Sequence, residues 1–309
     1  MTNQITLNLY CDEIKEVDII DPILGNEKWA YIGILIVPAL TEEELISKLL
    51  DKRCGNPKGT KSWAACVPFC KYHQKNDKEV HYQKTDSMDQ YFIASRWLDF
   101  LLTDTHLTYF YILGLDLMRL DYSYFGEAKH SDRFEKIYNR FFRTAVLKSV
   151  KSYFSKYETI EIKSIVHDQS EMSSGAYFPW HSIFRIGRDD GKIGFSCKRI
   201  EFINSDHRKS TDKRSHLIQY IDLILGATYN ALHWTSHDDN KMKLSLKLVP
   251  LLKRMMHKPN NTNSHYQYVG RTSIDFFPKY NYQSLSDWEK TIKSLDSFYK
   301  KRELRIERF

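Results

Sequence analysis

The chain has 309 residues, enough for one large domain with a substantial core. Its apolar fraction of 42% and charged fraction of 28% exclude a disordered or fibrous protein. A surplus of Lys and Arg, 46 against 39 Asp and Glu, gives a formal charge of +7 and favours polyanionic partners such as nucleic acid. No run approaches the roughly 18 apolar residues of a membrane span, no secretory signal is visible, and the Cys residues follow no disulfide spacing. We therefore expect a cytoplasmic protein.

The first elements are two strands and a helix. Residues 5–11 alternate in polarity and end at Asp12-Glu13, which predicts a strand that delivers acids at its carboxyl end. Residues 29–37 are almost continuously apolar and stop at Pro38, as in a buried strand. Thr41 and Glu44 have capping-box spacing, which predicts a short helix to about residue 51.

The middle of the chain begins with an irregular stretch, residues 52–78, which we interpret as an insertion or long loop. Helical apolar spacing predicts helices over residues 88–102 and 132–153. Between them, residues 107–117 form an apolar and aromatic run typical of a central strand.

The remaining elements repeat this alternation. Residues 160–166 predict a strand followed by His167-Asp168-Gln169, and residues 199–203 predict a short one. Residues 213–233 form a strongly apolar helical pattern, and residues 241–256 predict a further helix. Strands alternating with helices indicate an α/β layered domain.

We place this main domain at residues 5–258. The segment 259–309 is Tyr-rich and ends in a basic amphipathic pattern near residues 285–303, which predicts a C-terminal helical extension packed on the main domain.

Three aspartates are the candidate site. Asp12 and Asp168 each follow a predicted strand, and ligand sites of open α/β sheets gather beyond the carboxyl ends of strands. Acids in such places are also common as turn residues and helix caps. Asp222 is more unusual because it lies inside an apolar helix, where a carboxylate needs a cation, hydrogen-bond donors or a metal.

Neighbouring positions on that helix extend the candidate site. Spacing of three to four residues aligns His216, Gln219, Asp222, Gly226 and Tyr229 along one stripe. Gly226, one turn after Asp222, would permit close approach of another backbone or of substrate. An ordinary alternative is an Asp paired with an Arg or a capping amide.

Several carboxylates around one point repel each other unless a divalent ion neutralises them, and hard oxygen ligands select Mg²⁺ or Mn²⁺. Such clusters cleave phosphodiesters. Glu79 is a candidate fourth ligand, with His81 able to handle a proton or contact phosphate, and the alternative is that both are solvated loop residues. Glu13 is weaker because adjacent strand residues point to opposite faces. Which of Glu13 and Glu79 is the fourth carboxylate stays open.

Other motifs are less informative. Ser205-Asp206 precedes the helix of Asp222 and could contact a phosphate or form a cap. Cys54, Cys66, Cys70 and His73 match structural zinc spacings poorly, so unrelated thiols are the competing interpretation. No glycine-rich phosphate loop or nucleophile elbow is present.

Taken in order, several of these segments resemble the bacterial domain-of-unknown-function family 3800, over about residues 7–231. The matching pieces are Tyr10-Cys11-Asp12-Glu13, residues 31–37, Glu79-Val80-His81, Val166-His167-Asp168, Ser205 and residues 217–227. The resemblance implies an RNase H-like fold, with a mixed sheet flanked by helices. It also implies a nuclease encoded near mobile elements or phage-defence genes. The chain departs from the family pattern at two places: Ile14-Lys15 after the first acids, and the bulky Tyr220-Ile221 before the helix Asp.

These observations predict a divalent-metal-dependent nuclease. Asp12, Asp168 and Asp222 would hold the metal with Glu79, and His81 and Gln219 would orient substrate or water. Basic stretches, residues 198–214 and the C-terminal helix, would follow the phosphate backbone.

One alternative is an inactive nucleic-acid- or protein-binding module on the same fold, and another is a phosphatase or phosphodiesterase acting on small nucleotides. The choice of DNA or RNA, and whether the protein forms a homo-oligomer, stay open.

Overall fold

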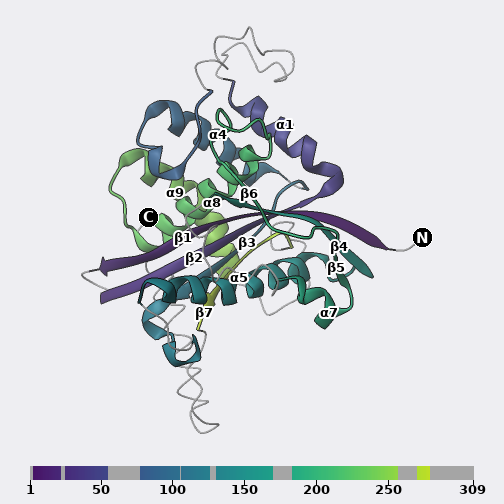
Figure 1. Ribbon diagram of the computed structural model, residues 1–309. Helices are drawn as coiled ribbons and strands as arrows, with labels where there is room; N and C mark the ends of the chain where they lie inside the picture. Colours follow the sequence, from purple (N-terminus) through teal and green to yellow (C-terminus); the bar gives the residue numbers. More distant parts are fainter. Residues whose placement is uncertain are drawn as a thin grey trace.

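The computed structural model describes residues 3–21, 25–54, 77–104, 106–125, 130–169, 183–256 and 270–278. These residues form a mixed α/β structure with a seven-stranded sheet (Figure 1). The strands are β1 (Gln4–Asp21), β2 (Gly25–Pro38), β3 (Tyr109–Asp116), β4 (Thr159–Asp168), β5 (Ile193–Phe195), β6 (Glu201–Ile203) and β7 (Thr272–Phe277). The α-helices are α1 (Glu42–Lys52), α4 (Met88–Thr103), α5 (His130–Phe154), α7 (Ile186–Asp190), α8 (Ser215–His233) and α9 (Asp239–Met256).

The sheet has the order β5-β4-β1-β2-β3-β7, and β6 pairs with the carboxyl end of β4. β1, β2 and β3 are antiparallel neighbours, whereas β4 runs parallel to β1 and β7 runs parallel to β3. β1 is therefore an interior strand, with an antiparallel neighbour on one side and a parallel neighbour on the other.

Helices cover both faces of the sheet (Figure 1). α1, α4, α8 and α9 pack on one face, and α5 and α7 pack on the other, so the protein has two apolar cores. We call the first the α8 face and the second the α5 face. Side chains that alternate along a strand enter one core or the other.

β1 continues beyond Asp12, where the sequence predicted that this strand would end. Residues 12–21 remain paired with β2 in an antiparallel ribbon, with a register shift between Ile14 and Val17. Charged residues at 15, 16 and 18 interrupt the apolar alternation, so the pattern by itself does not indicate a strand there. Asp12 consequently lies inside β1, just past Cys11, which pairs with His167 at the end of the β1–β4 ladder.

A β-bulge in β4 determines which face Asp168 occupies. Leu7 pairs with Ile162 but the next residue, Asn8, pairs with Ser164, so β4 holds one extra residue. Before the bulge Ile162 lies on the α5 face, and after it His167 lies there, packed against Phe142 of α5. Asp168 therefore points to the α8 face, as Asp12 does; unbroken alternation would have turned it away.

Gly33 allows α8 to approach the sheet at this level. It is paired with Asp12 across the β1–β2 ladder. A Cβ atom at position 33 would lie 3.2 Å from Cγ1 of Ile221 and 3.3 Å from Cδ1 of Leu225, tighter than ordinary side-chain contacts. The absence of a side chain thus lets the helix that carries Asp222 pass close to the strand that carries Asp12.

Apart from the longer β1, the predicted elements agree with the structure in type and approximate position. The short elements β5 and α7 were not predicted. No side-chain hydrogen bond from Thr41 caps α1, since its hydroxyl donates instead to the carbonyl of Pro38 at 3.1 Å. β7 was also not predicted; it lies after residue 258 and extends the sheet at its β3 edge. Arg271 beside it pairs with the buried Asp104 at 3.2 Å.

Some predictions lie outside the described residues: most of the irregular stretch 52–78 and the basic helix near residues 285–303. Among the helices that are described, none is long and apolar enough to cross a membrane.

Candidate active site

The carboxyl groups of Asp12 and Asp222 meet between β1 and α8. Asp12 is 8% exposed, and burial together with the negative charges of Asp222, Glu13 and Asp168 holds its pKa well above the ordinary range. Burial also raises the pKa of Asp222, while His81, the backbone N–H of Tyr82 and a hydrogen bond from the Asp12 carboxyl oppose that rise. The two acids therefore form a pair in which one carboxyl donates to the other, a pair favoured by a shared proton or a cation.

Asp168 is the third acid of this cluster. It ends β4 on the α8 face, and burial raises its pKa, with smaller upward contributions from Glu13 and Asp222. Its charge in turn raises the pKa of Asp12. The structure thus brings the three predicted aspartates within electrostatic range of one another, at the carboxyl end of the β1–β4 ladder.

The cluster is open to solvent at Asp222. Every other residue of α8 is buried, whereas the Asp222 side chain retains 18% of its exposure. Within the described part of the chain, no Lys or Arg forms an ion pair with Asp12, Asp168 or Asp222. Asp222 is therefore reachable from water, and none of the described Lys and Arg side chains neutralises the three acids by direct contact.

A short segment preceding α4 is held against Asp222. The backbone N–H of Tyr82, the first residue of the 3₁₀ helix η2 (Tyr82–Lys84), donates to Asp222 Oδ2 at 2.7 Å. The ring of Tyr82 lies over Gly226, where a Cβ atom would fall 2.3 Å from Cγ of that ring. Gly226 was predicted to permit a close approach, and the approaching group is this tyrosine.

Glu79 and His81 both lie beside Asp222. His81 Nδ1 is 3.6 Å from Asp222 Oδ2 and accepts a hydrogen bond from the backbone of Gln83. Glu79 accepts hydrogen bonds from Lys84 Nζ at 2.6 Å and from the Ser205 hydroxyl at 3.0 Å. Although burial raises the pKa of Glu79, these two donors bring it below the usual value. Both oxygens of the predicted fourth ligand are thus already bonded within the protein.

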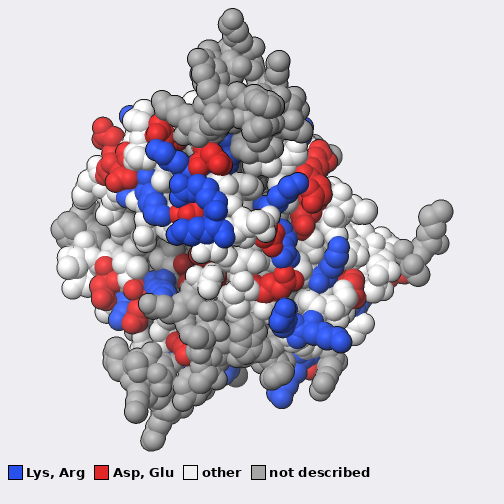
Figure 2. Space-filling model, turned by 45° about the horizontal axis from the view of Figure 1, so that its top comes forward, with Lys and Arg blue, Asp and Glu red and all other residues white. Residues whose placement is uncertain are grey.

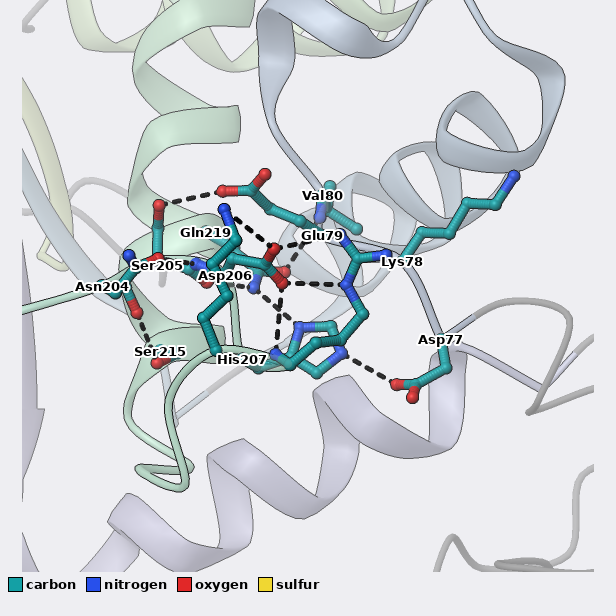
Figure 3. A network of polar contacts seen from close by, with 12 residues as sticks. Asp77, Lys78, Glu79, Val80, Asn204, Ser205, Asp206, His207, Ser215 and Gln219 are labelled. Carbon is teal, nitrogen blue, oxygen red and sulfur yellow. Dashed lines mark hydrogen bonds and ion pairs between the residues drawn. The ribbon is translucent and has the colours of Figure 1, made fainter.

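Gln219 joins three segments around α8 (Figure 3). Its carbonyl oxygen accepts from the backbone N–H of Val80 at 3.0 Å and from Arg53 at 2.7 Å. Its amide donates to the carbonyl of Ser205 and to His207 Nδ1, at 2.5 and 3.0 Å. Gln219 is 1% exposed, so its polar groups hold the walls of the site together.

Arg53, at the end of α1, completes this buried network. Its guanidinium also donates to the carbonyl of Lys78 at 2.7 Å and lies 5.0 Å from the ring centroid of Trp97. The sequence did not single out Arg53. No motif surrounds it, and its partners come from segments 25 to 166 residues away.

Two histidines in this network are held neutral. The His207 and His216 rings lie 4.6 Å apart, and His207 also bonds Asp77 at 2.8 Å. Burial and the charge of Arg53 lower the pKa of His207. The same causes, with His207 itself, lower the pKa of His216 well below the ordinary value.

We expect His216→Gln to reduce the sensitivity of the protein to acid. Below the usual histidine pKa of about 6.5, His216 is protonated in the unfolded chain but stays neutral in the folded protein. The free energy of unfolding therefore falls as the pH is lowered. The variant should lose about 1 to 2 kcal/mol less than the wild type between about pH 7.5 and pH 5, measured by urea unfolding. His237→Gln, at an exposed position, is the control and should behave as the wild type. Equal acid sensitivity in all three proteins would contradict the expectation.

Glu13 lies on the opposite face of the sheet from Asp12. Its Oε2 is 3.3 Å from Nε2 of the fully buried His167, and that same nitrogen bonds the Tyr138 hydroxyl at 2.6 Å. His167 Nδ1 contacts the carbonyl of Asp168 at 2.9 Å. Glu13 therefore supports the strands from behind the acid cluster, as strand alternation predicts.

The donor set of the cluster suits a hard divalent cation, since it consists of carboxylates whose charges oppose each other. Among the described residues, however, no three His, Cys, Asp or Glu side chains converge closely enough to bind one ion as they stand. The contacting pair is Asp12 and Asp222, with Asp168 coupled to it by charge.

The remaining candidates contribute little to this cluster. Asp206 binds Arg208 at 2.9 Å, and Arg214 binds Glu201 and Asp212, so acids within the basic stretch 198–214 pair with its arginines. Of the zinc candidates, Cys54 is buried, and Cys66, Cys70 and His73 lie outside the described residues.

Comparison with known proteins adds no relative. None of the protein-family models matches this chain, and no curated protein matches its sequence.

Proposed function

We propose that the protein is a divalent-metal-dependent nuclease of RNase H-like architecture. The central β1, its antiparallel neighbours β2 and β3, and the parallel β4 are compatible with the fold that the family-3800 resemblance implies. That resemblance rests on the order of the motifs in the sequence.

One observation carries the proposal: the Asp12–Asp222 pair, with Asp168 in range, is reachable from solvent and lacks a Lys or Arg counterion among the described residues. Burying like charges together costs stability unless a cation occupies the site. An enclosure of this kind, made of oxygen donors at the carboxyl end of parallel strands, is what Mg²⁺ or Mn²⁺ catalysis of phosphodiester hydrolysis requires.

Asp12 and Asp222 would hold the metal, with Asp168 adding a third negative charge. When bound, the ion supplies a polarised phosphoryl oxygen and an activated water. The chain itself does the positioning: the Tyr82 N–H orients Asp222, and Gln219 with Arg53 keeps the Glu79–Tyr82 segment against α8. His81, 3.6 Å from Asp222, would contact the attacking water or a phosphate oxygen.

A binding module without catalysis is the second candidate, because a buried polar network can serve a fold that only binds nucleic acid. The acid pair argues against it, since a purely binding surface gains nothing from adjacent carboxylates that repel both each other and phosphate.

The decisive experiment incubates purified full-length protein with single- and double-stranded DNA and RNA in Mn²⁺, in Mg²⁺ and in EDTA. The proposal expects cleavage of at least one polymer with either metal and none in EDTA. Salt-sensitive binding without cleavage in any condition would favour the binding module. Turnover of mononucleotides or cyclic nucleotides alone would indicate a small-molecule phosphodiesterase.

A further inference from the structure

Lys84 places an ammonium group at the edge of the acid cluster. It is the last residue of η2, two positions after Tyr82, whose N–H contacts Asp222. Its Nζ lies 2.6 Å from Glu79 Oε2, yet 57% of its side chain is exposed, against 10% for that of Glu79. A group entering beside Asp222 would therefore meet this cation early.

Arg208 is a second exposed cation in the surroundings of Glu79. Its side chain is half exposed and donates to Asp206 from Nε at 2.9 Å. Those hydrogen bonds raise the pKa of Arg208, and the negative charges of Glu79 and Asp77 raise it further, so the guanidinium lies within electrostatic range of Glu79. Lys84 thus contacts the nearly buried Glu79 directly, and Arg208 adds a second solvent-accessible positive charge within electrostatic range. Figure 2 shows Lys and Arg interspersed with Asp and Glu on the face it presents.

In the contact between Lys84 and Glu79, the carboxylate is fixed in position and the ammonium is not. Glu79 is fixed from its other side, because Ser205 donates to Oε1 at 3.0 Å and the backbone of the following residue, Val80, is held by Gln219 (Figure 3). The Lys84 ammonium, by contrast, is at the end of a long side chain that is mostly in solvent. Because solvent screens this end of the ion pair, another anion can compete with Glu79 for the ammonium.

We propose that Lys84 binds a backbone phosphate of the nucleic-acid strand, next to the phosphodiester held at Asp12 and Asp222, and that Glu79 holds the ammonium until that phosphate replaces it. The inference rests on the proposed function and identifies the residue that recognises the polyanion. A carboxylate and a phosphate offer the ammonium the same paired oxygens, so the exchange requires only a rotation of the lysine side chain.

The test measures binding without cleavage. A fluorescein-labelled single-stranded DNA oligonucleotide, and its RNA counterpart, is titrated with the full chain in Ca²⁺, and fluorescence anisotropy is followed at several salt concentrations. Lys84→Gln should weaken binding roughly tenfold and reduce the salt slope by about one ion. Lys84→Arg should retain most of the affinity. Lys192→Gln is the matched control, since Lys192 is exposed beside β5 at the opposite end of β4 from Asp168.

The Glu79→Gln variant should change the affinity for the oligonucleotide in the opposite direction, which separates phosphate binding by Lys84 from a structural role. Because the Lys84 ammonium is then no longer paired with a carboxylate, this variant should bind the oligonucleotide several-fold more tightly than the wild type. If Glu79→Gln and Lys84→Gln weaken binding alike, the two residues act as a structural unit and the inference is overturned. Loss of the Mn²⁺-induced rise in melting temperature in Glu79→Gln would instead make Glu79 a metal ligand, which also overturns it.

The two proposals fail in different ways. Cleavage by the wild type together with unchanged binding by Lys84→Gln would remove the role of Lys84 and leave the nuclease intact. Weakened, salt-sensitive binding by Lys84→Gln without any wild-type cleavage would retain the phosphate contact and remove the nuclease.

Discussion

Asp222→Asn is expected to lower metal-dependent cleavage by roughly a hundredfold to a thousandfold, the loss typical of removing one preorganised group from a reacting charge. Asn has nearly the shape of Asp and can still accept from the Tyr82 N–H and bond the Asp12 carboxyl. The change therefore removes a charge from the site while keeping its hydrogen bonds. Initial rates in Mn²⁺ on the preferred polymer measure the effect.

The same variant should be more stable than the wild type when no metal is present. Because burial and neighbouring acids raise the pKa of Asp12 and of Asp222, the pair stabilises the fold at acid pH. That contribution is lost as the pH rises through the raised values. Asp222→Asn should relieve the repulsion and gain about 1 to 2 kcal/mol at neutral pH in EDTA.

With metal bound, the wild type should instead be more stable than Asp222→Asn. A ligand that binds only the folded wild type at about 100 times its dissociation constant adds about 2.7 kcal/mol, or about 5 to 10 °C in melting temperature. Asp222→Asn and Asp12→Asn should show little of that shift. Glu158→Gln, an exposed acid in the turn before β4, should keep the full shift and the full cleavage rate. An unaltered Mn²⁺ shift in Asp222→Asn would show that the pair is not the metal site.

Gly226→Ala is expected to destabilise the protein by about 2 to 3 kcal/mol, although alanine is the better helix former by about 1 kcal/mol. The new Cβ atom would lie 2.3 to 2.6 Å from Cβ, Cγ and Cδ1 of Tyr82, so the tyrosine must move. Its displacement would also withdraw the N–H that contacts Asp222 and the hydroxyl that contacts Ser245 at 3.3 Å. We therefore expect the melting temperature and the metal-dependent activity to fall together.

A double-mutant cycle identifies the cause. In a Tyr82→Gly background the clash is absent, and Gly226→Ala should then stabilise the protein by about 1 kcal/mol through helix propensity. Gly270→Ala, where a Cβ atom would meet nothing within 4 Å, is the control and should change stability little. A Gly226→Ala effect of the same size in both backgrounds would show that the contact with Tyr82 is not its origin.

Much of the site could be predicted because its chemistry is unusual for its surroundings. An aspartate within the apolar helix α8 requires a partner wherever the helix packs, and Asp168 ends its strand as expected. Gly226 could be singled out from its position one turn after Asp222, whereas Gly33 carries no such signal, since the atoms it makes room for come from a distant segment. Lys84 and Arg53 escaped notice for the same reason: a single basic residue without a motif acquires a role only from its contacts.

The amino-acid sequence by itself determined most of the elements and their order, because apolar periodicity is a local property that indicates which residues form helices and strands. It also showed that Asp222, inside an apolar helix, needed an explanation, and it offered Asp12 and Asp168 as candidates for the same site. Strand alternation made Glu13 the weaker candidate for the fourth carboxylate. Only the tertiary structure decided that β1 continues past Asp12 and that β7 joins the sheet, since both depend on pairing with distant strands.

The face occupied by Asp168 is the sharpest case of that division. One extra residue in β4, between the partners of Leu7 and Asn8, reverses the alternation and turns Asp168 toward Asp12 and α8. A bulge depends on the pairing register of two strands and on how their side chains pack in the core. The sequence of one strand alone therefore does not specify it. The sequence supplies the three aspartates, but the packing of the sheet decides whether their side chains lie together.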